Sequence, residues 1–117
     1  MRSDNPVQIK SYDFALRIIK VYKYLSQEKK EFVLSKQLLR SGTSIGANIE
    51  ESIGGQSKAD FFAKITIAYK EARESKYWIR LLRDSDYLTI EQSSDLLKDV
   101  EELLKIIGSI QKTVRNS

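Results

Sequence analysis

The chain lacks both cysteine and histidine. Without cysteine there is no disulfide framework and no thiolate chemistry, and without histidine the commonest metal ligand and the usual proton carrier are missing. No apolar run approaches the roughly 20 residues of a membrane span, and the N-terminal segment holds no signal-peptide core. We therefore expect a cytoplasmic protein with no membrane partner. One proline and five glycines leave few breaks, which favours long helices.

Length and charge are those of a small folded domain with a weak basic excess. A chain of 117 residues allows a single hydrophobic core, so we expect one domain over 1–117. The formal net charge is +4. Residues 58–84 carry seven basic and four acidic side chains, whereas residues 85–117 carry four basic and six acidic ones. A basic side and an acidic side favour anionic partners or contact between copies.

Apolar residues recur at helical spacing through four segments, which polar or glycine-rich breaks separate. We expect helices over about 6–28, 34–53, 57–83 and 89–115. Polar side chains should cap three of them at their N-termini: Asn5 with Pro6, Ser57 with Asp60, and Thr89 with Gln92. No segment alternates with a period of two over strand length. The sequence therefore predicts an all-α, antiparallel up-down-up-down four-helix bundle.

Two connections between the helices have expected features of their own. Gly54-Gly55 should end the second helix, with one of the glycines in the left-handed conformation. Phe32 and Val33, which precede that helix, should plug one end of the bundle.

The stretch Arg40–Ile53 has the pattern of a helix although it contains Gly42 and Gly46, one turn apart. Each glycine costs roughly 1 kcal/mol relative to alanine inside a helix, so we expect another helix to pack very closely there. Asn48, on the flank of the apolar arc, should hydrogen-bond a neighbouring backbone group and hold this packing in register. Binding of a ligand by Asn48 is the alternative.

The third and fourth predicted helices carry more apolar side chains than one inward stripe requires. The surplus residues are Ile67, Trp78, Leu81, Leu97 and Leu104. One interpretation is a broad core face with a few scattered exposed residues, which is common. The other is an interface between subunits, since exposed apolar patches mark contacts. Trp78 is then its central residue, because tryptophan is enriched at interface hot spots.

Carboxylates are the remaining candidates for chemistry. Di-metal sites in helical bundles use Glu-x-x-His pairs, which a chain without histidine cannot supply. Glu71 and Glu74, like Glu50 and Glu51, are conceivable ligands, but we expect Glu51 and Glu74 to face solvent or bind a basic partner across helices. No glycine-rich phosphate loop follows a strand, and no serine has a histidine base. We expect no enzyme activity, metal or cofactor; a small-ligand binder or enzyme around Glu50, Glu51 and Asn48 is the weakest alternative.

Basic residues form a ridge along one face of the third predicted helix, with a tyrosine at its head: Tyr69, Arg73, Lys76, Arg80 and Arg83. Arginines at such spacing can follow nucleic-acid phosphates, and tyrosine can stack on a base. The first predicted helix offers a smaller set, Lys10, Arg17 and Lys20. The alternative is a solvated flank whose cations pair with Asp or Glu of a neighbouring helix.

Three segments carry a family resemblance: QLLRSGTSIGANIEE at 37–51, SKADFFAK at 57–64 and AYKEARESKYWIRLL at 68–82. With these segments, the chain resembles the small bacterial four-helix bundle proteins encoded in intervening sequences of 23S ribosomal RNA genes. Tyr87-Leu88 matches the end of that family's Gly-Tyr-Leu turn, with Asp86 in place of the glycine. Ser52 stands where many relatives have glycine.

The resemblance implies a homopentamer of four-helix bundles whose molecular activity is not established. The family is also similar in fold to the accessory protein of diversity-generating retroelements, a basic pentameric barrel that binds a reverse transcriptase and nucleic acid; this likeness is an analogy. We therefore expect a non-enzymatic homo-oligomer that associates with RNA through the basic ridge. The alternative is a protein-interaction module that binds another polypeptide, such as a reverse transcriptase.

Overall fold

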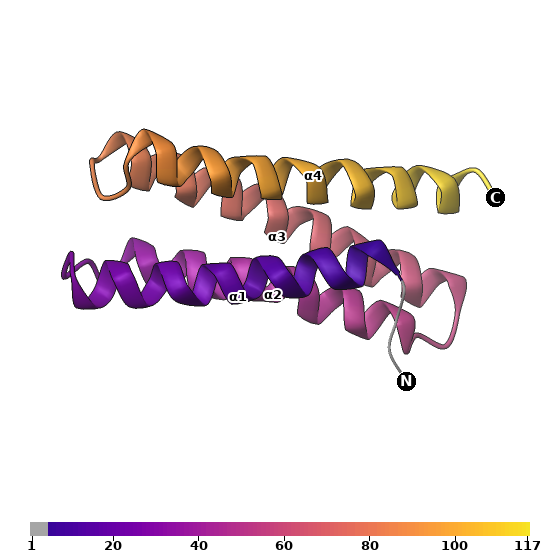
Figure 1. Cartoon of the computed structure of the whole chain (residues 1–117). Coiled ribbons are helices and arrows are strands. Elements are labelled where there is room, and N and C mark those ends of the chain that lie inside the picture. The colour runs from indigo at the N-terminus through magenta and orange to yellow at the C-terminus, as the bar shows by residue number, and fades with distance from the viewer. Residues whose placement is uncertain (1–4) are drawn as a thin grey trace.

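Residues 5–117 are described by the computed structural model, and they form four helices joined by short loops. The helices are α1 (Pro6–Gln27), α2 (Leu34–Ile53), α3 (Lys58–Asp84) and α4 (Ile90–Arg115). The α1–α2 and α3–α4 loops lie at one end of the molecule and the α2–α3 loop at the other, so successive helices run in opposite directions (Figure 1). The described residues form no strand, and the prediction of an all-α four-helix bundle is confirmed.

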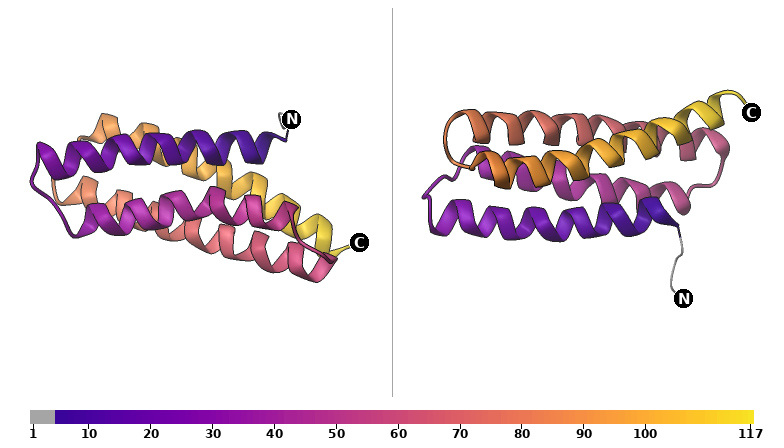
Figure 2. Two further views of the ribbon diagram at one scale, coloured as in Figure 1. Left: turned by 90° about the horizontal axis from the view of Figure 1, so that it is seen from below. Right: turned by 45° about the horizontal axis from the view of Figure 1, so that its top comes forward.

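The four helices are not equally close to one another. α2 packs closely on both α1 and α3, α3 packs on α4, and α4 meets α1 over a shorter stretch. Two further views of this arrangement are given in Figure 2. Each helix contributes one apolar stripe to the interior. The largest fully buried side chains are Phe14, Ile18, Leu25, Leu38, Ile45, Ile49, Ile65, Ile79, Leu82, Val100, Leu103 and Ile107.

Gly42 and Gly46 both face α1. A Cβ atom on Gly42 would lie 2.9 Å from Cγ1 and Cγ2 of Ile18, and one on Gly46 would lie 3.4 Å from the backbone oxygen of Ser11. Ile18 is fully buried and branched at Cβ, so its side chain has little freedom to move away. The backbone of α2 therefore approaches α1 most tightly at Gly42, and the fit at Gly46 is looser.

Serine side chains meet where α2 packs on α3. The hydroxyl oxygens of Ser41 and Ser75 are 2.9 Å apart, and both residues are fully buried. Asn48 donates from Nδ2 to the backbone oxygen of Ser44, at 2.9 Å, so the expected bond to a backbone group lies within α2 and not across the helix interface. The small side chains that meet at this interface, rather than Asn48, allow the two helices to come close.

Glu31 caps α2 from the preceding loop. Its carboxylate accepts hydrogen bonds from the backbone N–H groups of Val33, Leu34 and Ser35, at 3.2, 3.0 and 2.7 Å. Burial of the residue, which is 8% exposed, opposes ionisation, but these hydrogen bonds outweigh it and hold the pKa of Glu31 below its ordinary value. The carboxylate thus satisfies the free N–H donors of the first turn and complements the positive end of the helix dipole.

The same loop leaves two apolar side chains in solvent. Phe32 is 52% exposed and Val33 is 71% exposed. The expectation that they plug the end of the bundle is wrong, because Glu31 turns inward to cap α2 and the next two residues point outward.

Two loops contain a left-handed residue that is not glycine: φ is 55° at Lys30 and 68° at Asp86. Asp86 is the position at which the resembling family has glycine, which adopts this conformation without steric cost. Gly54 and Gly55 have no positive φ, so the expected left-handed cap of α2 is wrong. Gly55 is required for space instead, because a Cβ there would lie 3.1 Å from the backbone oxygen of Ser52.

Replacing Glu31 with Gln should lower the free energy of unfolding by about 1–2 kcal/mol at neutral pH, because an amide oxygen accepts hydrogen bonds more weakly than a carboxylate. Since the pKa is lowered in the folded protein, the carboxylate stabilises the fold fully above its ordinary pKa of 4.5 and progressively less as the pH falls below it. Urea unfolding between about pH 3 and pH 7 should therefore show a weaker loss of stability in acid for Glu31→Gln than for the wild type. Glu28→Gln, at an exposed neighbour, is the control; an equal change in both variants would contradict the capping role.

Gly42→Ala should lower the free energy of unfolding by about 1 kcal/mol, because crowding against Ile18 costs roughly 1–3 kcal/mol and the gain in helix propensity returns only about 1 kcal/mol. Gly46→Ala should leave stability unchanged or raise it, since its methyl group meets Ser11 at 3.4 Å, an ordinary contact distance. Thermal unfolding of the two variants measures the difference. A larger loss at Gly46 than at Gly42 would show that the tight approach lies at the other glycine.

Candidate nucleic-acid interface

An open groove of about 720 Å³ runs between α3 and α4. The α3 side carries Tyr69, Arg73, Lys76, Tyr77 and Arg80. These residues follow one another at helical spacing and share one face of α3. Four of them belong to the basic ridge expected from the sequence. Most of that ridge therefore lines a hollow between two helices.

The α4 side adds two charged residues, one apolar residue and one glycine: Glu101, Lys105, Leu104 and Gly108. Lys76 Nζ lies 2.9 Å from Glu101 Oε1, so one ion pair joins the two helices. Arg73, Arg80 and Lys105 form no ion pair with any other residue of 5–117. The charge of Arg80 still reaches Asp84, outside the groove, and helps to lower the pKa of that carboxyl. Arg73 and Lys105 are thus the groove cations without an acidic partner in the described chain.

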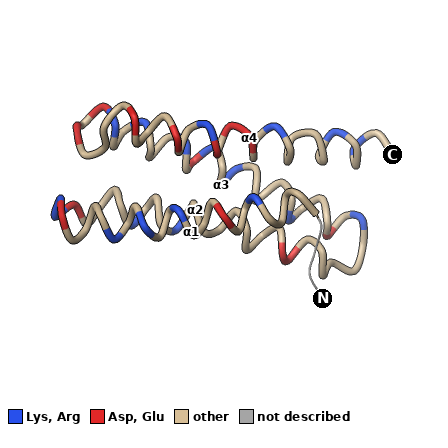
Figure 3. Tube along the Cα trace, in the orientation of Figure 1, with Lys and Arg blue, Asp and Glu red and all other residues tan. Residues whose placement is uncertain are grey.

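The C-terminal part of α4 is basic. Beyond Glu102 every charged residue of the helix is Lys or Arg, as the blue segments in Figure 3 show. Lys105 is the first of these residues and lies in the groove. Positive charge therefore comes from both helices that form the groove.

The two tyrosines of the groove have different surroundings. Tyr69 is half-buried and packs against the core, and its Cε1 lies 3.4 Å from the place that a Cβ on Gly108 would occupy. Tyr77 is 51% exposed. Its ring meets the ring of Trp78 edge-on, with centroids 5.2 Å apart and an interplanar angle of 68°. Tyr77 therefore offers an open aromatic surface, whereas the ring of Tyr69 lies against the backbone of α4.

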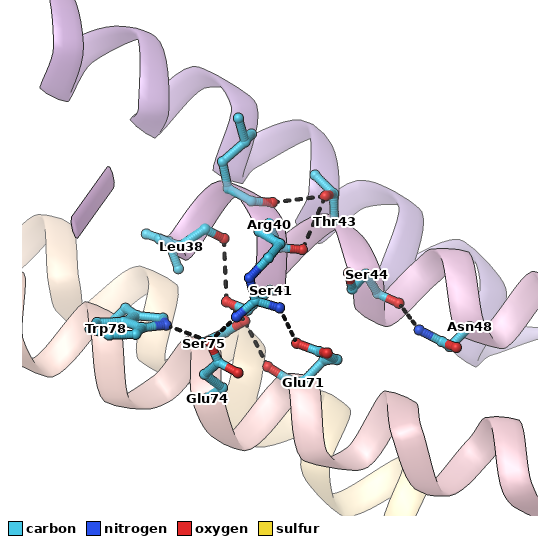
Figure 4. Close-up of polar contacts among 11 residues, drawn as sticks. Leu38, Arg40, Ser41, Thr43, Ser44, Asn48, Glu71, Glu74, Ser75 and Trp78 are labelled. Atoms are coloured by element: carbon cyan, nitrogen blue, oxygen red, sulfur yellow. Dashed lines mark hydrogen bonds and ion pairs between the residues drawn. The ribbon is translucent and has the colours of Figure 1, made fainter. Parts of the chain in front are cut away.

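Trp78 is held by a polar network between α2 and α3, which Figure 4 shows. Its Nε1 donates to Glu74 Oε2 at 2.9 Å. Arg40 of α2 pairs with the same Glu74 carboxylate and, at 3.1 Å, with Glu71. Both carboxylates thus bind a basic side chain across helices, and the indole orientation is fixed through Glu74.

Arg83, the last residue of the expected ridge, lies outside the groove. Its Nε donates to Asp84 Oδ1 at 2.7 Å. This hydrogen bond holds the pKa of the Asp84 carboxyl below its ordinary value. The part of the ridge that faces the groove therefore ends at Arg80.

The smaller basic set on α1 lies beside α4. Lys10 Nζ is 3.1 Å from Glu102 Oε1, and Arg17 pairs with Asp99. Lys20 is exposed and borders a shallow hollow between α1 and α4. Two of the three cations thus make the pairing with a neighbouring helix that was the alternative to nucleic-acid contact.

The residues expected at a subunit interface are mostly covered within the bundle. Trp78, Leu97 and Leu104 are half-buried and pack against the core. Leu81 is half-buried as well, and Ile67 is 39% exposed. Of the five, Ile67 has the largest exposed fraction.

A second apolar stripe, which we call the α1 stripe, is exposed on α1: Ile9, Tyr12, Leu16 and Ile19. Steps of three, four and three residues place these side chains on one face of the helix, away from its buried face. Their exposure runs from 36% at Ile19 to 66% at Tyr12. The α1 stripe is therefore a larger candidate contact surface than the one expected on α3 and α4.

Tyr77 and Lys105 are groove residues that the sequence analysis did not single out. Tyr77 lies four residues after Arg73 and three before Arg80, so helical spacing alone is a sufficient signal for it. No such signal exists for Lys105, because spacing within one helix does not reveal which residues of another helix lie opposite.

The other carboxylates considered for chemistry are dispersed. Glu50 and Glu51 are exposed on α2, and Glu50 accepts a hydrogen bond from Gln8. In the part of the chain that the structure describes, no three acidic side chains gather as metal ligands. None of the helices formed by residues 5–117 has the length and apolar character needed to cross a bilayer.

Comparison with known proteins yields one family and a close structural relative, and a search of the curated proteins finds no match. The relative is a crystal structure of a protein of unknown function from the S23 ribosomal protein family of Bacteroides thetaiotaomicron. It is 53% identical to this chain, with a TM-score of 0.90, and the match covers 91% of this chain and 98% of that one. The family model described as 23S rRNA-intervening sequence protein matches residues 3–109. With the groove and four-helix bundle lying almost wholly inside that range, the chain belongs to the 23S rRNA-intervening sequence protein family.

Proposed function

We propose that this chain is a non-enzymatic, self-associating helical bundle that binds nucleic acid, RNA in the first place, through the α3–α4 groove. The observation that supports this most directly is the charge of the groove. Arg73, Arg80 and Lys105 form no ion pair with any other described residue, and the groove's one carboxylate, Glu101, is paired with Lys76. Rows of uncompensated cations attract nucleic-acid phosphates and release their counterions.

The spacing of the cations suits a strand of phosphates. Arg73 and Arg80 are seven residues apart, which separates them by about 10 Å along the helix axis. Each guanidinium can donate two parallel hydrogen bonds to one phosphate. Lys105 enters the same groove from α4, so a bound strand meets positive charge on both sides.

The groove contains binding groups rather than catalytic ones. Acid–base and nucleophilic catalysis need a proton-transfer group within reach of a reacting atom. Glu101 is engaged with Lys76, and the chain has neither histidine nor cysteine. These residues support recognition of an anion and give no pair that resembles a nucleophile and its base.

The α1 stripe supports self-association, and it also favours the second candidate function, a protein-interaction module. Exposed apolar stripes on helices are docking faces for other helices. Glu50, which binds Gln8, lies toward the N-terminal end of this face, and Lys20 and Lys23 lie toward its C-terminal end. A second copy of the same face can therefore match apolar with apolar surface and acid with base. Five copies, which the family resemblance implies, need a second and different face on each chain, because a face that pairs with itself closes a dimer.

Replacing Arg73, Arg80 and Lys105 together with Ala should weaken binding of a single-stranded RNA by about tenfold or more, because three phosphate contacts are lost. Fluorescence anisotropy of a labelled RNA, titrated at several KCl concentrations, measures both the affinity and its salt dependence. For the wild type, the logarithm of the binding constant should fall against the logarithm of salt with a slope of about −2 from these three contacts.

A triple variant at Lys29, Lys36 and Lys58, which are exposed outside the groove and outside the α1 stripe, removes the same charge and serves as the control. It should bind RNA nearly as well as the wild type. Equal weakening in both triple variants, or wild-type binding that does not respond to salt, would exclude the groove as the binding site.

Leu16→Glu should lower the native mass of the protein toward that of the 13.5 kDa chain, because a charge in the centre of the α1 stripe opposes apolar docking. Ile67→Glu is the matched control, since Ile67 is 39% exposed on α3 and Leu16 is 46% exposed on α1. Light scattering coupled to size-exclusion chromatography measures the masses. Dissociation by Ile67→Glu alone would move the interface to α3, and a monomeric wild type would exclude self-association.

A further inference from the structure

We infer that the α3–α4 groove takes single-stranded rather than duplex nucleic acid, with one unpaired base stacked on Tyr77. This inference rests on the proposed function and narrows its ligand. Tyr77 lies one helical turn from Arg73 on one side and one turn from Arg80 on the other. An aromatic surface between two cations that form no ion pair within the described chain matches a nucleotide, whose base is flat and apolar and whose flanking phosphates are charged.

The ring of Tyr77 is available and is already oriented. Half of the residue is exposed, and the ring is in edge-on contact with Trp78 at a centroid distance of 5.2 Å, which restricts its orientation. Trp78 is in turn fixed by its 2.9 Å hydrogen bond to Glu74, which Arg40 holds from α2. A ring that is oriented before binding loses less conformational freedom when a base stacks on it.

Tyr69, the tyrosine at the head of the ridge, is less suited to stacking. Its ring is half-buried and lies close to the backbone of α4 at Gly108. Tyr69 therefore forms part of the groove wall, and the exposed ring beside the arginines is that of Tyr77. We therefore expect Tyr77, and not Tyr69 as the sequence suggested, to stack on a base.

A duplex cannot stack a base on Tyr77. The faces of its bases are already stacked on one another, so a duplex presents phosphates and base edges but no free base face. It can engage Arg73, Arg80 and Lys105 electrostatically, but not Tyr77. The same holds for a strand that lacks bases. Both ligands therefore separate the contribution of the ring from that of the charges.

The test compares three labelled RNAs of equal length: a single strand, a duplex, and a single strand with abasic sites in place of its bases. The wild type should bind the intact single strand about tenfold more tightly than the abasic strand. Tyr77→Leu, which keeps an apolar side chain without a ring, should lose about that factor for the intact strand and leave abasic binding unchanged. Tyr77→Phe should bind like the wild type.

Phe32→Ala removes an aromatic residue of matching exposure, 52% against 51% for Tyr77, from the α1–α2 loop outside the groove. It should leave all three affinities unchanged. Because Trp78 is the only tryptophan of the chain, its fluorescence should respond to the intact strand and not to the abasic one, which gives a second readout in the unmodified protein.

The outcomes separate the inference from the function on which it rests. Equal affinity for the intact and abasic strands, with no effect of Tyr77→Leu, overturns the stacking inference. Salt-dependent binding that still requires Arg73, Arg80 and Lys105 would then leave the proposed function standing. If none of the three RNAs binds, the proposed function fails as well; an acidic peptide that binds the groove in their place would identify it as a site for protein.

Discussion

The close approach of α2 to its two neighbours is the constraint on which the rest of the bundle depends. On one side the backbone at Gly42 leaves room only for Ile18 of α1, and on the other the hydroxyls of Ser41 and Ser75 meet inside the α2–α3 contact. Helices can approach this closely only where small residues replace bulky ones. α4 packs on α3 through its apolar stripe and meets α1 over a shorter stretch. Long charged side chains join it to both neighbours at the exposed edges of these contacts.

The charged side chains of α4 determine which cations on the surface form ion pairs and which do not. Acidic residues of α4 pair with cations of α1 and α3, as in Lys10–Glu102, Arg17–Asp99 and Lys76–Glu101. Exposed ion pairs of this kind contribute little stability, about 0–1 kcal/mol each. Their larger effect is on the distribution of surface charge. They neutralise cations of α1 beside α4, whereas the groove and the C-terminal end of α4 stay positively charged (Figure 3).

Helical periodicity was sufficient to predict the fold, because four apolar stripes and their caps are local features. The predicted capping box at Thr89 and Gln92 is present in full. Glu31 was not recognised, since a glutamate in a charged loop shows no sign that it turns inward. Only the α3 side of the groove could be predicted, because helical spacing places Arg73 and Arg80 on one face. The presence of Lys105 opposite them depends on the register of α4 against α3, which packing across the bundle determines.

The α2 stretch that packs most closely in the bundle is also linked to the groove through side-chain contacts. Arg40, one turn before Ser44 and beside the buried Ser41, crosses to α3 and holds Glu74, which orients Trp78 (Figure 4). Trp78 in turn supports Tyr77 at the edge of the groove. The small residues of α2 let α3 come near enough for Arg40 to reach Glu74. The close α2–α3 contact therefore also determines where the aromatic rings on another face of α3 lie. The α2 segment that packs most closely therefore also helps to position Tyr77, through the contact of Arg40 with Glu74.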